Sequence, residues 1–214
     1  MITTDIQAYE AFPTLHHWFN KLWLSEYLGY NCGPAGIAPV ESNYYIVRPI
    51  MNLAGMSIGA EKKWIEGGDN KSVKPGYFWC EWFTGEQLSV DYKWDNKWIP
   101  LSGWRAYVDV DNLYKFNRWE KVYEYPKLSG RFNELAYNNV NVINVEFING
   151  KPIEVHLRPS PDPSYDELIP IWQGEEKKVE YLKQLGYTYI DSYDDGESYL
   201  LQPRQGFMVK NNKR

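Results

Sequence analysis

The sequence predicts an α+β protein with antiparallel sheets and flanking helices, and three observations support this prediction. Strand-like segments follow one another across short turns, as antiparallel strands do. Segments with a helical period occur among them, without a regular alternation of strand and helix. Hydrophobic residues make up 43% and charged residues 24% of the chain, an ordinary balance for a folded globular protein.

The first half of the chain begins with an amphipathic pattern. Apolar residues recur in steps of three and four from Leu15 to Tyr27, which predicts a helix over 14–29 that ends at Gly29. Composition then predicts a loop at 31–43, a strand at 44–47, a glycine-rich loop at 51–60 and an aromatic strand at 77–83.

The second half is richer in strands. Asp95-Asn96 and Asn149-Gly150 each stand between two strand-like segments, which is typical of hairpins. The predicted elements are strands at 88–94, 97–101 and 104–110, a helix at 128–137, strands at 140–148 and 151–158, a helix at 175–185, and strands at 187–192 and 198–202.

Charge and cysteine usage exclude several classes of protein. A net charge of -5, with no Lys and Arg cluster beyond Lys213-Arg214, argues against nucleic-acid binding. The polar start of the chain and the lack of long apolar runs argue against a secretory signal and membrane insertion. Cys32 and Cys80 are too few for a disulfide framework. We therefore expect a cytoplasmic protein that binds neither nucleic acid nor membrane.

Aromatic residues are unusually frequent, with ten Trp and eighteen Tyr. Such residues either fill the core of a sheet-rich protein or line a binding face for sugars or proteins. We expect core positions. A binding face would instead require Trp64, Trp82, Trp94, Trp98 and Trp104 to be exposed together.

The strand pair 140–148 and 151–158 carries the sharpest candidate site. Alternation along the second strand puts Glu154, His156 and Arg158 on one face. Carboxylates on one face repel unless a cation lies between them, and oxygen donors with an imidazole suit Mg²⁺ or Mn²⁺. Glu146, Glu154 and His156 are therefore candidate metal ligands, with Arg158 as a phosphate contact. A solvated polar face with a Glu–Arg pair explains the pattern as well.

The metal hypothesis depends on the turn between the two strands. A two-residue turn at Asn149-Gly150 would set Glu146 across from Ile153 and separate the carboxylates onto opposite faces. A three-residue loop would bring Glu146 and Glu154 together. Pro152, which cannot donate to a strand ladder, makes an irregular turn plausible.

These residues resemble the ATP-grasp superfamily. Glu154-Val155-His156-Leu157-Arg158 is similar to the Glu-x-Asn-x-Arg strand of that family, where Glu and Asn bind Mg²⁺ and Arg contacts phosphate. Glu146 matches the acidic ligand on the preceding strand. His156 stands where that family usually has Asn.

The resemblance extends upstream in the order that the family has. Tyr45-Ile46-Val47-Arg48-Pro49 resembles the strand whose Lys binds nucleotide phosphates, with Arg48 in place of Lys, and the glycine-rich loop at 51–60 follows it. The segment 79–91 is similar to the hinge between the two lobes. There Trp82 and Phe83 would read the adenine edge through their backbone, with Glu81 beside them. Arg105 is a further candidate for a phosphate or carboxylate contact.

The resemblance implies an ATP-grasp-like fold of two lobes, at 1–84 and 85–214. It implies ATP and Mg²⁺ as cofactors and a ligase reaction in which a carboxylate is activated as an acylphosphate for attack by an amine. The substrate is an unknown small-molecule or peptide acceptor. Because family ligases carry a domain ahead of the first lobe, a partner chain could supply it. A nucleotide-binding relative without catalysis is the alternative.

Overall fold

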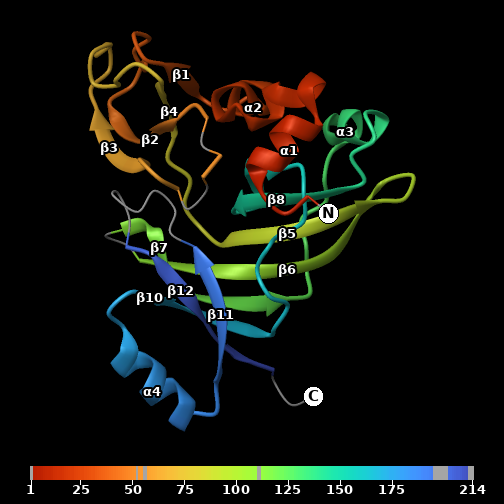
Figure 1. The fold of residues 1–214 in the computed structure, drawn as a ribbon. Coiled ribbons are helices and arrows are strands. Elements are labelled where there is room, and N and C mark those ends of the chain that lie inside the picture. Colours follow the sequence, from red (N-terminus) through yellow and green to blue (C-terminus); the bar gives the residue numbers. More distant parts are fainter. Residues whose placement is uncertain (1, 52, 55–56, 110–111, 195–201, 212–214) are drawn as a thin grey trace.

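The computed structural model describes residues 2–51, 53–54, 57–109, 112–194 and 202–211. They form two sheets with helices packed beside them (Figure 1). The smaller sheet has the strand order β1-β4-β2-β3, and the larger has the order β11-β12-β10-β7-β6-β5-β8-β9. Each neighbouring pair in these described sheets is antiparallel. The predicted α+β class with antiparallel sheets is confirmed.

The smaller sheet comes from one continuous part of the chain, and the larger sheet follows it. The strands of the smaller sheet are β1 Cys32–Pro34, β2 Asn43–Pro49, β3 Glu61–Ile65 and β4 Tyr77–Glu81. Those of the larger sheet are β5 Gln87–Trp94, β6 Trp98–Asp109, β7 Asn112–Val122, β8 Val142–Ile148, β9 Lys151–His156, β10 Glu167–Trp172, β11 Thr188–Asp194 and β12 Arg204–Lys210.

The two strands predicted at 97–101 and 104–110 are a single strand, β6. Gly103 does not interrupt it, because its backbone stays in register opposite Val90. A Cβ at this glycine would lie 2.9 Å from the ring of Tyr125 and 3.0 Å from a methyl of Val90. The glycine therefore allows close packing across the strand. The strand predicted at 198–202 lies outside the described residues except for Gln202.

The helices are short and lie mostly at the N-terminal end. They are α1 Asp5–Ala11, the 3₁₀ helix η1 Pro13–Phe19, α2 Lys21–Leu28, the 3₁₀ helix η2 Gly130–Phe132, α3 Asn133–Tyr137 and α4 Glu176–Gln184. The single helix predicted at 14–29 is divided at Asn20, whose side chain accepts a hydrogen bond from the Trp23 amide at 2.9 Å. It ends at Gly29 in the left-handed conformation, as predicted.

Helix α1 was not predicted, although its start carries a recognisable cap. The Thr4 hydroxyl accepts from the Gln7 amide, and the Gln7 side chain accepts from the Thr4 amide. This reciprocal capping box satisfies amides that the first turn leaves without partners. It fixes Asp5 at the start of the helix, where it points into the protein interior with 4% of its surface exposed.

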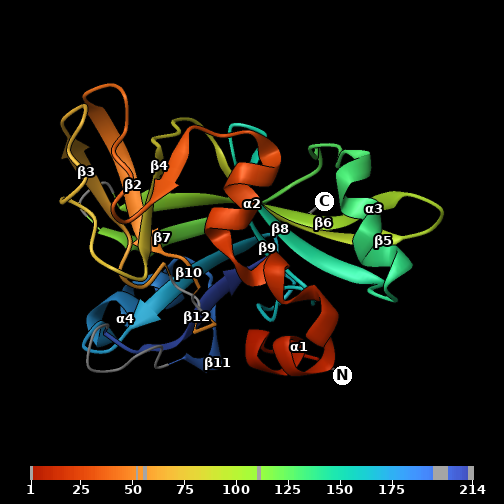
Figure 2. The same ribbon diagram turned by 90° about the horizontal axis from the view of Figure 1, so that it is seen from above.

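The main core lies between the N-terminal helices and the larger sheet, where α2 lies beside the edge strand β9 (Figure 2). The strands change sheet between Glu81 and Gln87, close to the predicted lobe boundary at 84. Residues 5–28 nevertheless pack on the larger sheet. Buried members of this core include Trp18, Leu24, Val90, Tyr92, Trp98, Phe132, Phe147 and Val155. The division into lobes at 84 stays a prediction.

Twelve of the aromatic residues that the structure describes are buried, and most of the others are half-buried, so the expected core positions are found in part. Trp98 and Trp104 are 8% and 7% exposed, and Trp82 and Trp94 are half-buried. Trp64 alone of the five candidates is exposed, at 47%. The open aromatic face proposed for a sugar- or protein-binding module is therefore wrong. Within the described residues, no helix has the length and apolar character needed to cross a bilayer.

Candidate functional site

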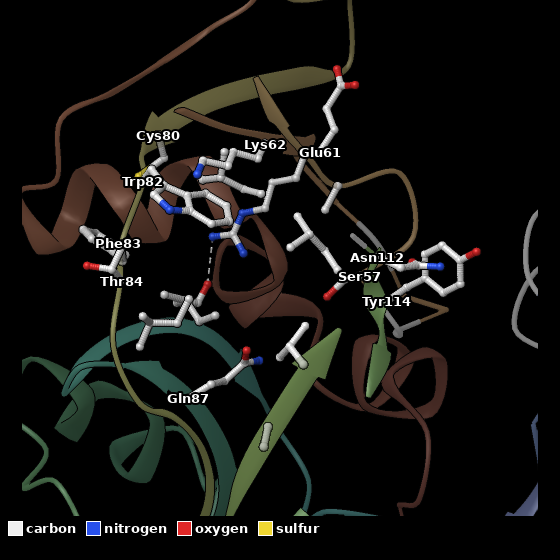
Figure 3. Close-up of a pocket in the computed structure, with 18 of the residues that line it drawn as sticks. Ser57, Glu61, Lys62, Cys80, Trp82, Phe83, Thr84, Gln87, Asn112 and Tyr114 are labelled. Atoms are coloured by element: carbon white, nitrogen blue, oxygen red, sulfur yellow. Dashed lines mark hydrogen bonds between the residues drawn. The ribbon is translucent and has the colours of Figure 1, made fainter. Parts of the chain in front are cut away.

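A large cleft lies between the smaller sheet and the neighbouring strands of the larger one. Its volume is about 1220 Å³, above the roughly 300–1,000 Å³ usual for ligand pockets. Strands β2, β3 and β4 supply one wall, and β5, β6 and β7 supply the other (Figure 3). The lining includes Arg48, Lys62, Trp82, Phe83, Gln87, Arg105, Asn112 and Tyr114. Room for more than one small molecule is available here.

The predicted hinge forms part of this cleft. Trp82 and Phe83 line it in the segment between β4 and β5. Glu81 does not line it, because successive side chains of a strand point to opposite faces. Glu81 instead accepts from the Asn31 amide at 3.2 Å and lies 3.8 Å from the Lys151 ammonium. Its place beside the nucleotide base stays a prediction.

Two cations reach the cleft from the smaller sheet. Arg48 in β2 is 9% exposed and donates from Nη2 to the Ile153 carbonyl at 3.0 Å, while its Nε is buried without a hydrogen-bond partner. The Lys62 ammonium in β3 lies 4.9 Å from the centre of the Trp82 ring. Both side chains thus bring positive charge to the cleft without a directly paired carboxylate, and such charge favours an anionic ligand.

Arg105 also lines the cleft, from β6. Its guanidinium is about two-fifths exposed and pairs with the Glu86 carboxylate. Glu86 also lines the cleft, so a carboxylate beside Arg105 already balances its charge. Of the candidate phosphate contacts at the cleft, Arg48 is therefore the stronger.

The hairpin between β8 and β9 brings the predicted carboxylates together. A two-residue turn at Asn149-Gly150, with φ values of 50° and 74°, joins the strands. The register then shifts, because Ile153 bulges from β9 next to Pro152 and has no partner in β8. Glu146 consequently lies opposite Glu154. The three-residue loop was therefore unnecessary, since a bulge beyond a short turn has the same effect.

The region around these carboxylates is a set of ion pairs, which we call the polar cluster. It consists of Asp5, Lys21, Glu146, Glu154, His156 and Arg158. The Lys21 ammonium lies 2.7 Å from Glu154, and both side chains are largely buried. Nε2 of His156 lies 3.7 Å from Glu146 and 3.8 Å from Glu154. The cations between the carboxylates are thus the chain's own.

Asp5 completes the cluster from the start of α1. One of its oxygens accepts from Nδ1 of His156 at 2.9 Å and from Arg158 at 2.8 Å. Burial raises the pKa of Asp5, but His156 and Arg158 outweigh it and lower this pKa to about 2. The three carboxylates are therefore matched by three cations at neutral pH.

The protonation of His156 follows from these neighbours. Burial alone would lower its pKa, but Asp5, Glu146 and Glu154 raise it to about 10. Burial would likewise raise the pKa of Glu154, yet Lys21 and His156 hold it below the ordinary value. In this arrangement His156 is therefore protonated at pH 7 and is the cation that lies between Asp5, Glu146 and Glu154.

The polar cluster does not fit a divalent cation in this arrangement. Among the residues that the structure describes, no three His, Cys, Asp or Glu side chains are placed to hold a metal ion. Glu154 and His156 line a hollow of about 10 Å³, enough for about one water. Arg158 does not line the cleft and pairs with Asp5, and its phosphate contact stays a prediction.

Three residues of the two sites were not predicted from the sequence. Lys62 lies in β3, a strand whose mixed Lys-Lys-Trp composition gave no clear period. Asp5 and Lys21 join the polar cluster across 151 and 133 residues of chain, a separation that local patterns cannot reveal. Two local signals in the sequence could have located these residues. The caps at Thr4 and Asn20 place Asp5 and Lys21 at the first position of a helix.

Comparison with known proteins gives similarity in structure only. No family model and no curated protein sequence matches the chain. An N5-carboxyaminoimidazole synthetase from Staphylococcus aureus, complexed with ADP, matches 93% of this chain and 69% of its own, with 9% identity and a TM-score of 0.57. The corresponding ribonucleotide synthetase from Thermus thermophilus matches 94% and 70%, with 8% identity and a TM-score of 0.53.

An ATP-grasp superfamily protein from Archaeoglobus fulgidus matches 92% of this chain and 65% of its own, with 14% identity and a TM-score of 0.49. The chain thus spans about two thirds of the length of these structures. Two antiparallel sheets that enclose a cleft agree with the two-lobed arrangement expected from the sequence. The chain has the ATP-grasp fold.

Proposed function

We propose that this protein binds ATP in the cleft between the two sheets. The observation that carries the proposal is the lining itself: aromatic rings at the hinge lie near cations without carboxylate partners at the cleft. Nucleotide sites need such a combination, because the base is flat and apolar while the phosphates are anionic. The Staphylococcus aureus structure of the same fold holds ADP, which supports this choice of ligand.

The phosphates would lie against Arg48 and Lys62. Arg48 lines the cleft and keeps donors beyond the bond from Nη2 to the Ile153 carbonyl, so it can make a charge-assisted hydrogen bond to a phosphate oxygen. Lys62 adds a point charge from the neighbouring strand. Trp82 and Phe83 line the cleft, and we propose that they pack on the base and contact the adenine edge through their backbone.

Calorimetric titration of the full chain with ATP tests the proposal. We expect saturable binding that persists in EDTA, because the chain supplies the cations. Lys62→Met should weaken ATP binding by about fivefold, the effect of about 1 kcal/mol for an exposed charge-assisted contact.

Lys63→Met is the matched control for this titration. Lys63 neighbours Lys62 in β3, does not line the cleft, and donates to the Ser72 carbonyl at 2.7 Å. Its substitution should leave ATP affinity unchanged. Absence of ATP binding by the unsubstituted protein, or equal effects of the two lysine substitutions, would refute the assignment.

The ligase reaction implied by the resemblance is a second, separate proposal. ATP would phosphorylate a carboxylate, and an amine would then displace phosphate from the acylphosphate. The observation that favours it is the size of the cleft, which extends past the nucleotide-binding wall to Arg105, Asn112 and Tyr114. Arg105 could contact the second substrate. The small-molecule or peptide acceptor, a partner chain with a substrate domain, and a cytoplasmic location stay predictions.

The polar cluster favours nucleotide binding without turnover, because Lys21 and His156 already neutralise Glu146 and Glu154. Phosphate release from ATP, measured with pools of carboxylates and amines in Mg²⁺, separates the two proposals. Release that requires both pools, and that Arg105→Met reduces, would support the ligase. Release at the buffer rate with every pool, from protein that binds ATP, would support binding alone.

A further inference from the structure

The chain has two cysteines, and the fold makes them direct neighbours. Cys32 in β1 and Cys80 in β4 are paired residues of an antiparallel ladder. They lie 48 positions apart in sequence, so this juxtaposition comes from the fold and not from local chain geometry. Both are free thiols in the structure.

The hydrogen bonds of the ladder show which kind of pair they form. The Glu81 amide donates to the Asn31 carbonyl at 2.8 Å, and the Ala35 amide donates to the Tyr77 carbonyl at 3.2 Å. These hydrogen-bonded pairs alternate with non-hydrogen-bonded pairs along an antiparallel ladder. Cys32 and Cys80 therefore occupy a non-hydrogen-bonded pair.

That position suits a covalent link. The two Cα atoms of a non-hydrogen-bonded pair are about 4.5 Å apart, and their side chains point to the same face of the sheet. Disulfides span Cα separations of about 4.4–6.8 Å, so the backbone need not move to form one. The geometry points to a reversible disulfide between Cys32 and Cys80, which we propose as a redox modification site in the wall of the cleft.

Access and charge distinguish the roles of the two thiols. Cys80 lines the cleft directly before the segment that carries Trp82 (Figure 3), although only 1% of the residue surface is exposed. Its hydrogen bond with Cys32 lowers the pKa of Cys80 and raises that of Cys32, and nearby Arg48 lowers the pKa of Cys80 further. Cys80 is thus the thiol that reacts with the oxidant, and half-buried Cys32 is the second thiol, which then attacks the oxidised Cys80 sulfur.

A hydroperoxide is the oxidant that this arrangement suits, because it is small enough to enter the cleft. The Cys80 thiol and H₂O₂ give a Cys80 sulfenic acid and water, as sulfur attacks one peroxide oxygen and the O–O bond breaks. The Cys32 thiol then attacks the sulfenic sulfur, forms the S–S bond and releases a second water. Two thiols are oxidised and one peroxide is reduced. The site does not depend on what the cleft binds.

The full reduced chain, treated with hydrogen peroxide, tests this proposal by intact mass and thiol titration after denaturation. We expect both thiols to disappear, the mass to fall by two hydrogen atoms without a change of oligomeric state, and dithiothreitol to restore both. The folded chain should form the disulfide faster than the same chain in urea, since the fold holds the thiols together.

The Cys32→Ser variant isolates the first step. Its Cys80 should gain one oxygen atom that dimedone captures, whereas Cys80→Ser should leave Cys32 reduced at the same peroxide concentration. Circular dichroism checks that each variant is folded. If a variant does not fold, the mass of the unsubstituted chain still shows whether the disulfide forms. Retention of both thiols, a persistent sulfenic acid in the unsubstituted chain, or a link between two chains would each overturn the proposal.

Discussion

The cleft and the polar cluster use the same kinds of side chain in opposite ways. At the cleft, Arg48 and Lys62 contact a carbonyl and aromatic rings, and no described carboxylate pairs with either. In the polar cluster, three carboxylates and three cations pair with one another behind the N-terminal helices. The cations of the first region therefore have no directly paired carboxylate, although the Arg48 charge still acts on Glu154, whereas the cations of the second region are paired.

This difference separates a binding role from a structural role. A ligand phosphate can replace water around the cleft cations, whereas it would have to break buried ion pairs to use those of the cluster. The cluster also connects distant parts of the chain, since Asp5 belongs to α1, Lys21 to α2 and Glu154 to β9. We interpret it as the link that holds the N-terminal helices on the larger sheet.

Removal of a cation from the cluster should have the largest effect. Lys21→Met leaves Glu154 buried without its closest partner, which costs about 3–5 kcal/mol when one member of a buried pair is lost. Urea unfolding followed by circular dichroism measures the free energy of unfolding.

The double variant Lys21→Met/Glu154→Gln is the control, because it removes the unpaired charge together with its partner. It should recover much of the stability lost in Lys21→Met. A double variant no more stable than the single one would contradict a buried-charge origin and indicate lost packing.

The pH dependence of stability should report the imidazolium in the cluster. The pKa of His156 is raised from 6.5 to about 10 in the folded state. Its contribution is fully present below pH 6.5 and is lost as pH rises through 10. Between these values the free energy of unfolding should fall by up to about 1.4 kcal/mol per pH unit.

His156→Gln lacks this titration, so its unfolding free energy should change less with pH across the same window. Urea unfolding of both proteins in steps of pH gives the comparison. Parallel curves for the two proteins would show that His156 is neutral in the folded state.

Local pattern predicted the antiparallel class and most strands of this fold. The hairpins at Asp95-Asn96 and Asn149-Gly150 occur as expected, since both asparagines adopt the left-handed backbone that tight turns require. Strands β1, β3, β7, β10 and β12 were missed. Strand β1 has only three residues, and the other four show no clean alternation, because neighbours on both sides determine their burial.

The residues of the candidate site also differ in whether a local pattern predicts them. Arg48, Trp82 and Phe83 were found because each belongs to a segment with a recognisable pattern, and each lines the cleft. The ion pairing of Glu146 and Glu154 within the polar cluster was not predictable. It depends on Lys21, which no short-range pattern in the sequence connects to them. Sequence spacing gives the face on which a carboxylate lies but not the cation that reaches it.

A matched pair of arginines tests the division between the two regions. Arg48 and Arg158 are similarly buried, but Arg48 lines the cleft and Arg158 pairs with Asp5. Arg48→Met should weaken ATP binding by about 10- to 100-fold, the equivalent of a charge-assisted contact of about 1.5–3 kcal/mol. Arg158→Met should lower stability and leave ATP affinity unchanged. Calorimetric titration with ATP, at a temperature where both variants are folded, measures the two affinities. An equal loss of ATP affinity in both variants would contradict the division.

The smallest effect should come from the cap that starts α2. The Asn20 side chain accepts from the Trp23 amide at 2.9 Å, and the next residue is Lys21 of the polar cluster. Asn20→Ala removes this acceptor and should cost about 1 kcal/mol in the free energy of unfolding, while Asn20→Ser keeps an acceptor and should cost much less. Because the cap acts on the helix and not on the cleft, ATP affinity should stay the same in both variants. A loss of affinity in Asn20→Ala alone would mean that Lys21, which also lines the cleft, contacts the nucleotide, and the separation of the two regions would then fail at this residue.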